Sequence, residues 1–126
     1  MLEVSHKAQK VHFAAGETII QKDTPGEMFY IIAEGTAEVT LPRPSGLDVV
    51  ADRLGPGKYF GEISLFTSKR TVATVRAIPE APLEALALDR LLFQRLLGES
   101  LEFQSAMQSV VSARLEHNRS VAEGKA

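Results

Sequence analysis

The sequence predicts a mainly β fold, an antiparallel β-barrel or jelly-roll with α-helices at its C-terminal end. From residue 11 to about residue 88, short apolar stretches rich in β-branched and aromatic residues alternate with Gly, Pro and Asp, which is typical of short strands joined by turns. After residue 88 the apolar residues recur at steps of three and four, as they do on one face of a helix. Many short strands followed by two helices favour a barrel that carries helices at one end.

The expected strands form a meander. Residues 29–33 (FYIIA) lie between Pro25-Gly26 and Glu34-Gly35, so they are predicted to form a buried strand that ends in a turn. Pro42 to Gly46 contains two prolines, which cannot donate ladder hydrogen bonds, and is therefore expected to be a hairpin loop. The other predicted strands are 36–41, 47–54, 74–78 and 83–88.

Two helices are expected over about residues 89–118. Asp89 is a candidate N-cap of the first, with Gly98 as its stop, and Ser100 is a candidate N-cap of the second. The second helix carries an apolar stripe formed by Phe103, Met107, Val110, Val111 and Leu115. This stripe predicts packing against the barrel or against a second copy of the chain in a homodimer. Residues 120–126 are expected to form a frayed tail.

Length and composition favour one ordinary globular domain over residues 1–126. Of the 126 residues, 44% are hydrophobic and 24% charged, and the formal net charge is −2. That balance provides no basic surface, so we expect no binding to nucleic acid. There is no cysteine and no apolar run of membrane-spanning length, which favours a cytoplasmic protein without direct membrane insertion.

Enzymatic and metal-dependent functions find no support in the sequence. The three histidines, His6, His12 and His117, lie near the two ends of the chain without metal-ligand spacing. No Gly-x-Ser-x-Gly elbow is present, so an activated serine nucleophile is not predicted. We therefore expect a binding protein that is not an enzyme and that has no resident cofactor or metal.

The segment Phe60–Val75 (FGEISLFTSKRTVATV) has the composition of an anion-binding loop. Gly61 allows close backbone approach, and a helical turn over 62–65 would direct unpaired N–H groups at a phosphate. Arg70 can present a planar fork to two phosphate oxygens, and the carboxylate of Glu62 can accept a hydrogen bond from a sugar hydroxyl. The alternative is that these two charges pair with each other or with solvent on a surface loop.

This segment resembles the phosphate-binding cassette of the cyclic nucleotide-binding domain family, Phe-Gly-Glu-hydrophobic-small-Leu followed by a loop and Pro-Arg-small-Ala-Thr-Val. The first half matches throughout. Further similarities, in the family's order and spacing, are FAAGETII at 13–20, FYII at 29–32 with Gly35, and LGPGKYFGE at 54–62. The resemblance covers about residues 11–118.

The resemblance implies a ligand and a set of contacts. The ligand would be cAMP or cGMP, the backbone around Gly61 to Ser64 would bind its phosphate, and Glu62 would bind the ribose 2′-hydroxyl. Arg70 would bind the exocyclic phosphate oxygens, and the second C-terminal helix resembles the family's lid. The full predicted ligand-binding set is Gly61, Glu62, Ile63, Ser64, Arg70, Thr71 and Val72.

One departure leaves two functions open. Counted back from Ala73, the usual arginine position holds Thr71, and Arg70 stands where the family often has proline. In extended backbone, one residue turns a side chain to the opposite face, although a loop could absorb the shift. Either the domain senses a cyclic nucleotide, or it keeps the fold without ligand and serves as a protein interaction module.

In the sensor interpretation, the ligand favours one position of the helices after Asp89 and so acts on an effector domain or partner protein outside this chain. Only Met1 to Lys10 precedes the predicted barrel, where the family usually has a helix. The sequence therefore predicts a short or excised sensor.

Overall fold

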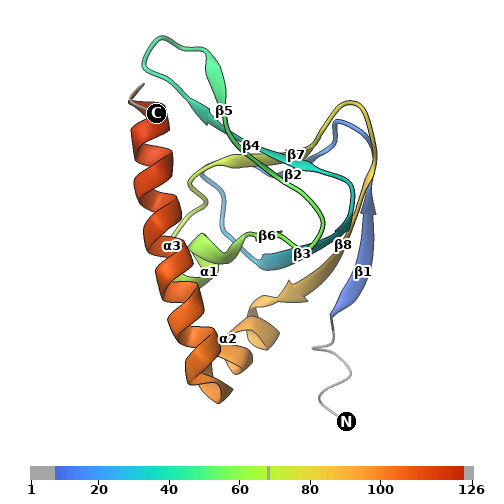
Figure 1. The fold of residues 1–126 in the computed structure, drawn as a ribbon, viewed down its shortest axis with the longest axis vertical. Helices are drawn as coiled ribbons and strands as arrows, with labels where there is room; N and C mark the ends of the chain where they lie inside the picture. The colour runs from blue at the N-terminus through green and yellow to red at the C-terminus, as the bar shows by residue number, and fades with distance from the viewer. Residues whose placement is uncertain (1–7, 68, 124–126) are drawn as a thin grey trace.

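The computed structural model describes residues 8–67 and 69–123. Within them it contains two antiparallel four-stranded sheets and three helices (Figure 1). The strands are β1 (Gln9–Phe13), β2 (Thr18–Ile20), β3 (Met28–Glu34), β4 (Ala37–Pro42), β5 (Asp48–Leu54), β6 (Tyr59–Phe60), β7 (Thr74–Ala77) and β8 (Leu83–Asp89). The helices are α1 (Glu62–Thr67), α2 (Arg90–Glu99) and α3 (Leu101–Ala122).

The two sheets have the strand orders β1-β8-β3-β6 and β2-β7-β4-β5, and each strand pairs only within its own sheet. The mainly β fold with C-terminal helices is thus confirmed. The sheets form a jelly-roll-like sandwich, and the closed-barrel alternative is wrong. Two of the edge strands are short, because β6 has two residues and β2 has three. Each therefore offers few backbone hydrogen bonds with which a strand of the other sheet could pair to close a barrel.

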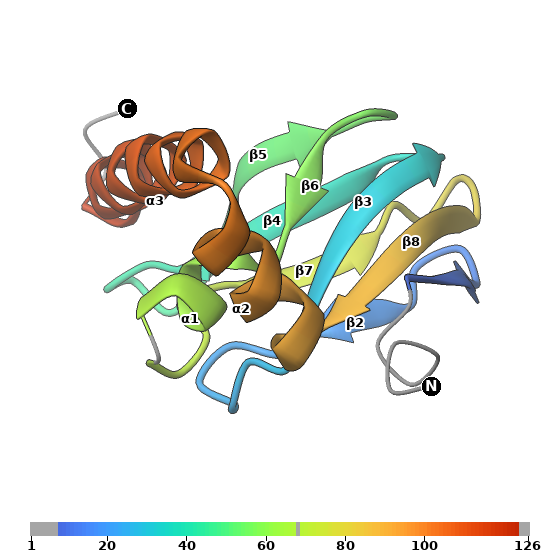
Figure 2. The ribbon, with the colours of Figure 1, turned by 90° about the horizontal axis from the view of Figure 1, so that it is seen from below.

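The main core lies between the sheets. It is built from strand residues of both sheets: Ile32, Ala37, Leu54, Phe60, Val75, Ala77, Leu83 and Ala85. A second cluster joins the first sheet to the helices through Phe29, Leu65, Leu88, Phe93 and Met107. The helices therefore pack on the sandwich by burying apolar area, and Figure 2 shows all three at the same side of it.

Both predicted N-caps are present. The Asp89 carboxylate accepts a hydrogen bond from the N–H of Leu92 at 2.8 Å, and the Ser100 hydroxyl accepts one from the N–H of Phe103 at 3.0 Å. Each cap satisfies an N–H group that the first helical turn leaves unpaired. Helix α2 continues one residue past the predicted stop at Gly98.

Helix α3 is longer than predicted. Residues 120–122, expected in a frayed tail, form its last turn because Val121, 6% exposed, packs against Leu41 and Ala73. Of the predicted stripe, Met107 and Val111 are buried, whereas Leu115 is exposed in the single chain, so Leu115 does not pack against the sandwich. Residues 124–126 of the predicted tail lie outside the described residues.

Met1 to Lys10 was expected to precede the first strand of the barrel. Residues 1–7 lie outside the described residues, and Gln9 and Lys10 belong to β1, which pairs with β8. No helix in the described part of the chain combines the length and apolar character needed to cross a membrane.

Candidate functional site

The first half of the cassette is held against β3 by a glycine. Gly61 has φ +94°, and a Cβ atom placed there would lie 2.4 Å from the carbonyl oxygen of Met28. No other residue type fits this combination of backbone conformation and close approach. The chain therefore turns from β6 directly into α1, which places Glu62 at the first position of the helix.

Glu62 is the most deeply buried charged side chain of the site. It is 1% exposed, and its Oε2 accepts a hydrogen bond from Nη1 of Arg114 at 2.6 Å. The Arg114 guanidinium also lies over the ring of Tyr59, 5.1 Å from its centroid, a favourable cation–π arrangement. The other carboxylate oxygen, Oε1, is buried and makes no hydrogen bond with any described residue. Such an atom is costly to bury and marks a place for a donor.

A cavity opens next to this carboxylate. Its lining comes from α1, the segment before β7, the strands β2, β4, β5, β6 and β7, and α3: Ile20, Val39, Asp52, Leu54, Phe60, Gly61, Glu62, Ile63, Ser64, Thr71, Val72, Ala73, Val75, Arg114, His117 and Asn118. Six of the seven predicted site residues line it. Arg70 does not.

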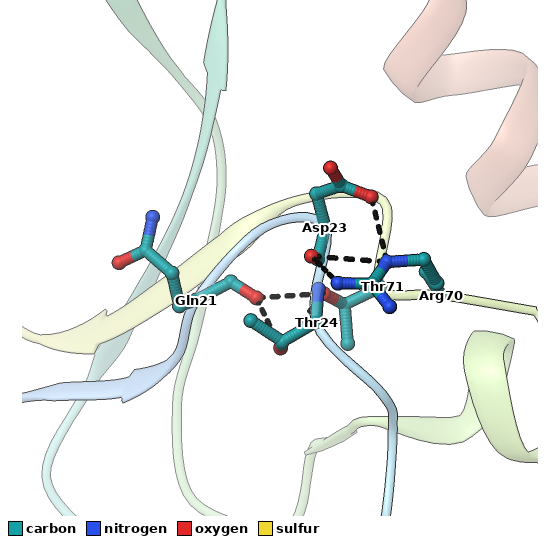
Figure 3. Close-up of polar contacts among 5 residues, drawn as sticks. All are labelled: Gln21, Asp23, Thr24, Arg70 and Thr71. Carbon is teal, nitrogen blue, oxygen red and sulfur yellow. Dashed lines mark hydrogen bonds and ion pairs between the residues drawn. The ribbon is translucent and has the colours of Figure 1, made fainter.

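Arg70 instead binds the loop between β2 and β3. Its Nε donates to Oδ1 of Asp23 at 2.9 Å, and its Nε and Nη2 donate to the carbonyl oxygen of Asp23 (Figure 3). The Arg70 side chain is 60% exposed. Arg70 forms an isolated antiparallel bridge with Pro25, so its backbone is extended and neighbouring side chains point to opposite faces. The alternative that Arg70 pairs with Glu62 finds no support in these contacts.

Thr71, the next residue, points inward and is fully engaged. Its hydroxyl donates to the carbonyl oxygen of Gln21 at 2.6 Å and accepts from the N–H of Thr24 at 3.0 Å (Figure 3). Backbone bonds from Thr71 N–H to Thr24 and from Asp23 N–H to Thr71 complete the attachment. The loop between β2 and β3 therefore fixes the second half of the cassette.

Helix α3 contributes three lining residues that the sequence analysis did not assign to the site: Arg114, His117 and Asn118. Nε2 of His117 lies 2.8 Å from the carbonyl oxygen of Ala51 on β5, which ties this part of α3 to the second sheet. The spacing of 114, 117 and 118 places these residues on one helical face. The only sequence signal that α3 reaches the site was its resemblance to the family's lid helix, and that resemblance identified no particular residue.

The cavity carries few charges. Among its described lining residues the permanent charges are those of Glu62, Asp52 and Arg114. The described residues include no group of three or more His, Cys, Asp or Glu that could hold a metal ion. The arrangement is that of a pocket for a small organic ligand, mostly apolar with a few convergent polar groups.

Residues 10–100 match the cyclic nucleotide-binding domain family. The cAMP-dependent protein kinase regulatory subunit of Dictyostelium discoideum is 40% identical over 93 residues, which are 71% of this chain and 28% of that protein.

Solved structures agree in fold. The regulatory domain of Toxoplasma gondii PKA in complex with cAMP has a TM-score of 0.71 and 26% identity, covering 86% of this chain and 39% of its own. The regulatory subunit of a cAMP-independent protein kinase A from Trypanosoma brucei has a TM-score of 0.70 and 25% identity, covering 81% and 37%. An EAL enzyme in its cAMP-bound form, at 21% identity and a TM-score of 0.69, shares the fold over 83% of this chain and 29% of its own.

The chain thus spans well under half the length of each of these proteins. The family match, in contrast, covers most of this chain, from residue 10 in β1 to the end of α2, and includes the whole cassette. The chain belongs to the cyclic nucleotide-binding domain family.

Proposed function

We propose that the cavity between α1, β7 and α3 binds cAMP or cGMP and that this binding regulates an effector domain or partner protein outside this chain. The observation that carries the proposal is that Glu62 lines this cavity and that its buried Oε1 has no hydrogen-bond donor among the described residues. A ribose 2′-hydroxyl would satisfy it. The domain then acts as a non-catalytic regulatory module in the cytoplasm, without nucleic acid as a partner.

The phosphate would lie against the backbone N–H groups at Gly61, Ile63 and Ser64, where α1 begins. Thr71 and Val72 would close the opposite wall of the site, since both line the same cavity. The predicted contact between Arg70 and the phosphate would require Arg70 to leave Asp23, and this contact stays a prediction. The purine base would lie toward Asn118 of α3 and Asp52 of β5, two polar residues that also line the cavity.

Binding would be linked to the helices through continuous contacts. Arg114 of α3 bonds to Glu62 and covers Tyr59, and the ring of Tyr59 lies 5.4 Å from that of Phe29. Phe29 in turn contacts Phe93 of α2 at 5.2 Å. A ligand that binds Glu62 more tightly in one arrangement of these residues shifts α2 and α3 toward that arrangement.

The apolar part of α3 also remains a candidate surface for a homodimer.

Isothermal titration calorimetry with cAMP and cGMP tests the proposal. Glu62→Gln keeps the shape of the side chain but removes the charge, so it should weaken binding about tenfold, which corresponds to the loss of a charge-assisted hydrogen bond. Glu80→Gln, an exposed residue between β7 and β8, is the matched control and should bind like wild type. Absence of saturable binding of either nucleotide at millimolar concentration would overturn the proposal and leave the protein interaction module.

A further inference from the structure

We propose that Arg114 of α3 supplies the positive charge that holds the ligand's phosphate, a role that the cassette segment does not fill in this chain. The inference rests on the proposed function and goes further, because it assigns the counter-charge to the lid helix. Among the described lining residues, Arg114 is the one arginine or lysine.

The cassette's own arginine is engaged elsewhere. Arg70 makes three contacts to the carbonyl and carboxylate of Asp23, and its side chain is 60% exposed. Figure 3 shows Arg70 and Thr71 extending from adjacent backbone positions into different surroundings. Moving Arg70 into the cavity would require both the loss of these bonds and a turn of the backbone that binds Thr24.

Thr71 stands at the cavity wall but offers little to an anion. A hydroxyl has one proton to donate, and that proton is given to the carbonyl oxygen of Gln21 at 2.6 Å. Freeing it would leave a carbonyl acceptor unpaired. Neither the charge of Arg70 nor the hydroxyl proton of Thr71 is therefore directed at the cavity.

Arg114 has donors to spare. A guanidinium carries five N–H groups, and among the described residues Arg114 makes a single hydrogen bond, from Nη1 to Glu62. The guanidinium carbon lies over the Tyr59 ring, 5.1 Å from its centroid, and this contact helps to hold the side chain in place. A planar fork of this kind fits two phosphate oxygens.

Charge balance points the same way. Glu62 is 1% exposed, so a phosphate monoanion in the same cavity would be repelled at low effective dielectric unless a cation lies between them. Arg114 already neutralises Glu62 and can bridge the carboxylate and the phosphate. Because Arg114 belongs to α3, the phosphate would then bind the lid helix directly, and the position of α3 would depend on the anionic part of the ligand.

The test measures the dissociation constant of cAMP, by calorimetry, for Arg114→Ala, Arg114→Lys and Arg70→Ala. Arg119→Ala, which removes an exposed arginine of α3, is the control. We expect Arg114→Ala to weaken binding at least tenfold, Arg114→Lys to recover part of the loss, and Arg119→Ala to have no effect. If Arg70→Ala weakens binding as much as Arg114→Ala does, the counter-charge is Arg70 and the proposal is wrong.

A Glu62→Gln background separates a phosphate contact from a role in holding Glu62. The neutral amide of this variant needs no counter-charge, so Arg114→Ala should still cost about tenfold there if Arg114 binds phosphate. Loss of the effect in that background would overturn the proposal and make Arg114 a positioning residue for Glu62. Failure of wild-type protein to bind either nucleotide would instead refute the proposed function itself.

Discussion

Glu62 and Arg70 belong to one sixteen-residue segment, Phe60–Val75, yet they occupy opposite environments. Glu62 is 1% exposed and faces the cavity, whereas the Arg70 side chain is 60% exposed and binds a surface loop. The first half of the cassette is fixed by its own backbone, through Gly61 and α1. The position of the second half depends on the contacts of its side chains, which here bind the loop between β2 and β3.

The comparison shows why a motif can match in sequence and differ in use. A glycine with positive φ followed by a helical turn imposes its geometry locally. An arginine in extended backbone can reach either face after a shift of one residue, and a nearby carboxylate then decides where it stays.

Arg114→Ala should destabilise the domain more than any change at Arg70. It leaves the Glu62 charge buried without its partner, at a cost of about 3 kcal/mol in the free energy of unfolding. Urea denaturation measures this loss. In the double variant Glu62→Gln, Arg114→Ala much of the stability should return. A loss below about 1 kcal/mol in the single variant would contradict the description of Glu62 as a charge that depends on Arg114.

Gly61→Ala should cost about 2–3 kcal/mol, because the new Cβ adds a clash with Met28 to a strained backbone conformation. Gly57 is the matched control, with φ +86° but nothing within 4 Å of an added Cβ. Gly57→Ala should therefore cost about 1 kcal/mol, the strain alone. Equal losses in thermal or urea unfolding would mean that close packing on β3 does not hold the first half of the cassette.

Thr71→Val should cost about 1–2 kcal/mol, because it leaves the Gln21 carbonyl and the Thr24 N–H without their partner. Thr40→Val removes a longer hydrogen bond, 3.5 Å to the Thr74 carbonyl, and should have a smaller effect. Chemical denaturation of both variants measures the difference. Equal stability of Thr71→Val and wild type would show that the loop does not fix the second half.

Glu38 extends the comparison to pH. Burial favours a raised pKa for this carboxyl, but hydrogen bonds and charge from Arg53 and Arg76 outweigh it and hold the pKa below its ordinary value. These ion pairs therefore contribute stability at neutral pH, and that contribution is lost as the pH falls below the ordinary glutamate pKa toward the lowered one.

Glu38→Gln should lower the free energy of unfolding by about 1 kcal/mol at pH 7, and the gap to wild type should narrow with acidification. Denaturation curves between about pH 7 and pH 3, a range that includes the ordinary glutamate pKa, give the measurement. If the difference in free energy of unfolding between wild type and Glu38→Gln increased as the pH fell, the lowered pKa of Glu38 would be contradicted.

Arg70→Ala should have the smallest effect on stability, below about 1 kcal/mol, because its ion pair with Asp23 is exposed on both sides. A double-mutant cycle with Asp23→Asn isolates the pair, and asparagine tolerates the positive φ of 66° at this position. A coupling energy above about 2 kcal/mol would show that Arg70 is a structural anchor of the cassette.

Much of the fold followed from local patterns. Turn residues such as Gly35, the caps Asp89 and Ser100, and the change of period after residue 88 act over a few residues, and the strands and helix starts agree with them. The helical turn that follows Gly61 was predictable for the same reason. The length of α3 was not, because its last turn depends on contact between Val121 and the distant residues Leu41 and Ala73.

By itself, the sequence determined the positions of strands β3, β4, β5, β7 and β8, the starts of the two C-terminal helices and the family, since each depends on short-range spacing. The role of Glu62 as the acceptor at the site stays a prediction. Only the tertiary structure decided which cation enters the cavity. Asp23 is 47 residues from Arg70, and Arg114 is 52 residues from Glu62. Ion pairs over such separations form only when packing brings their elements together, and a carboxylate selects the arginine that reaches it.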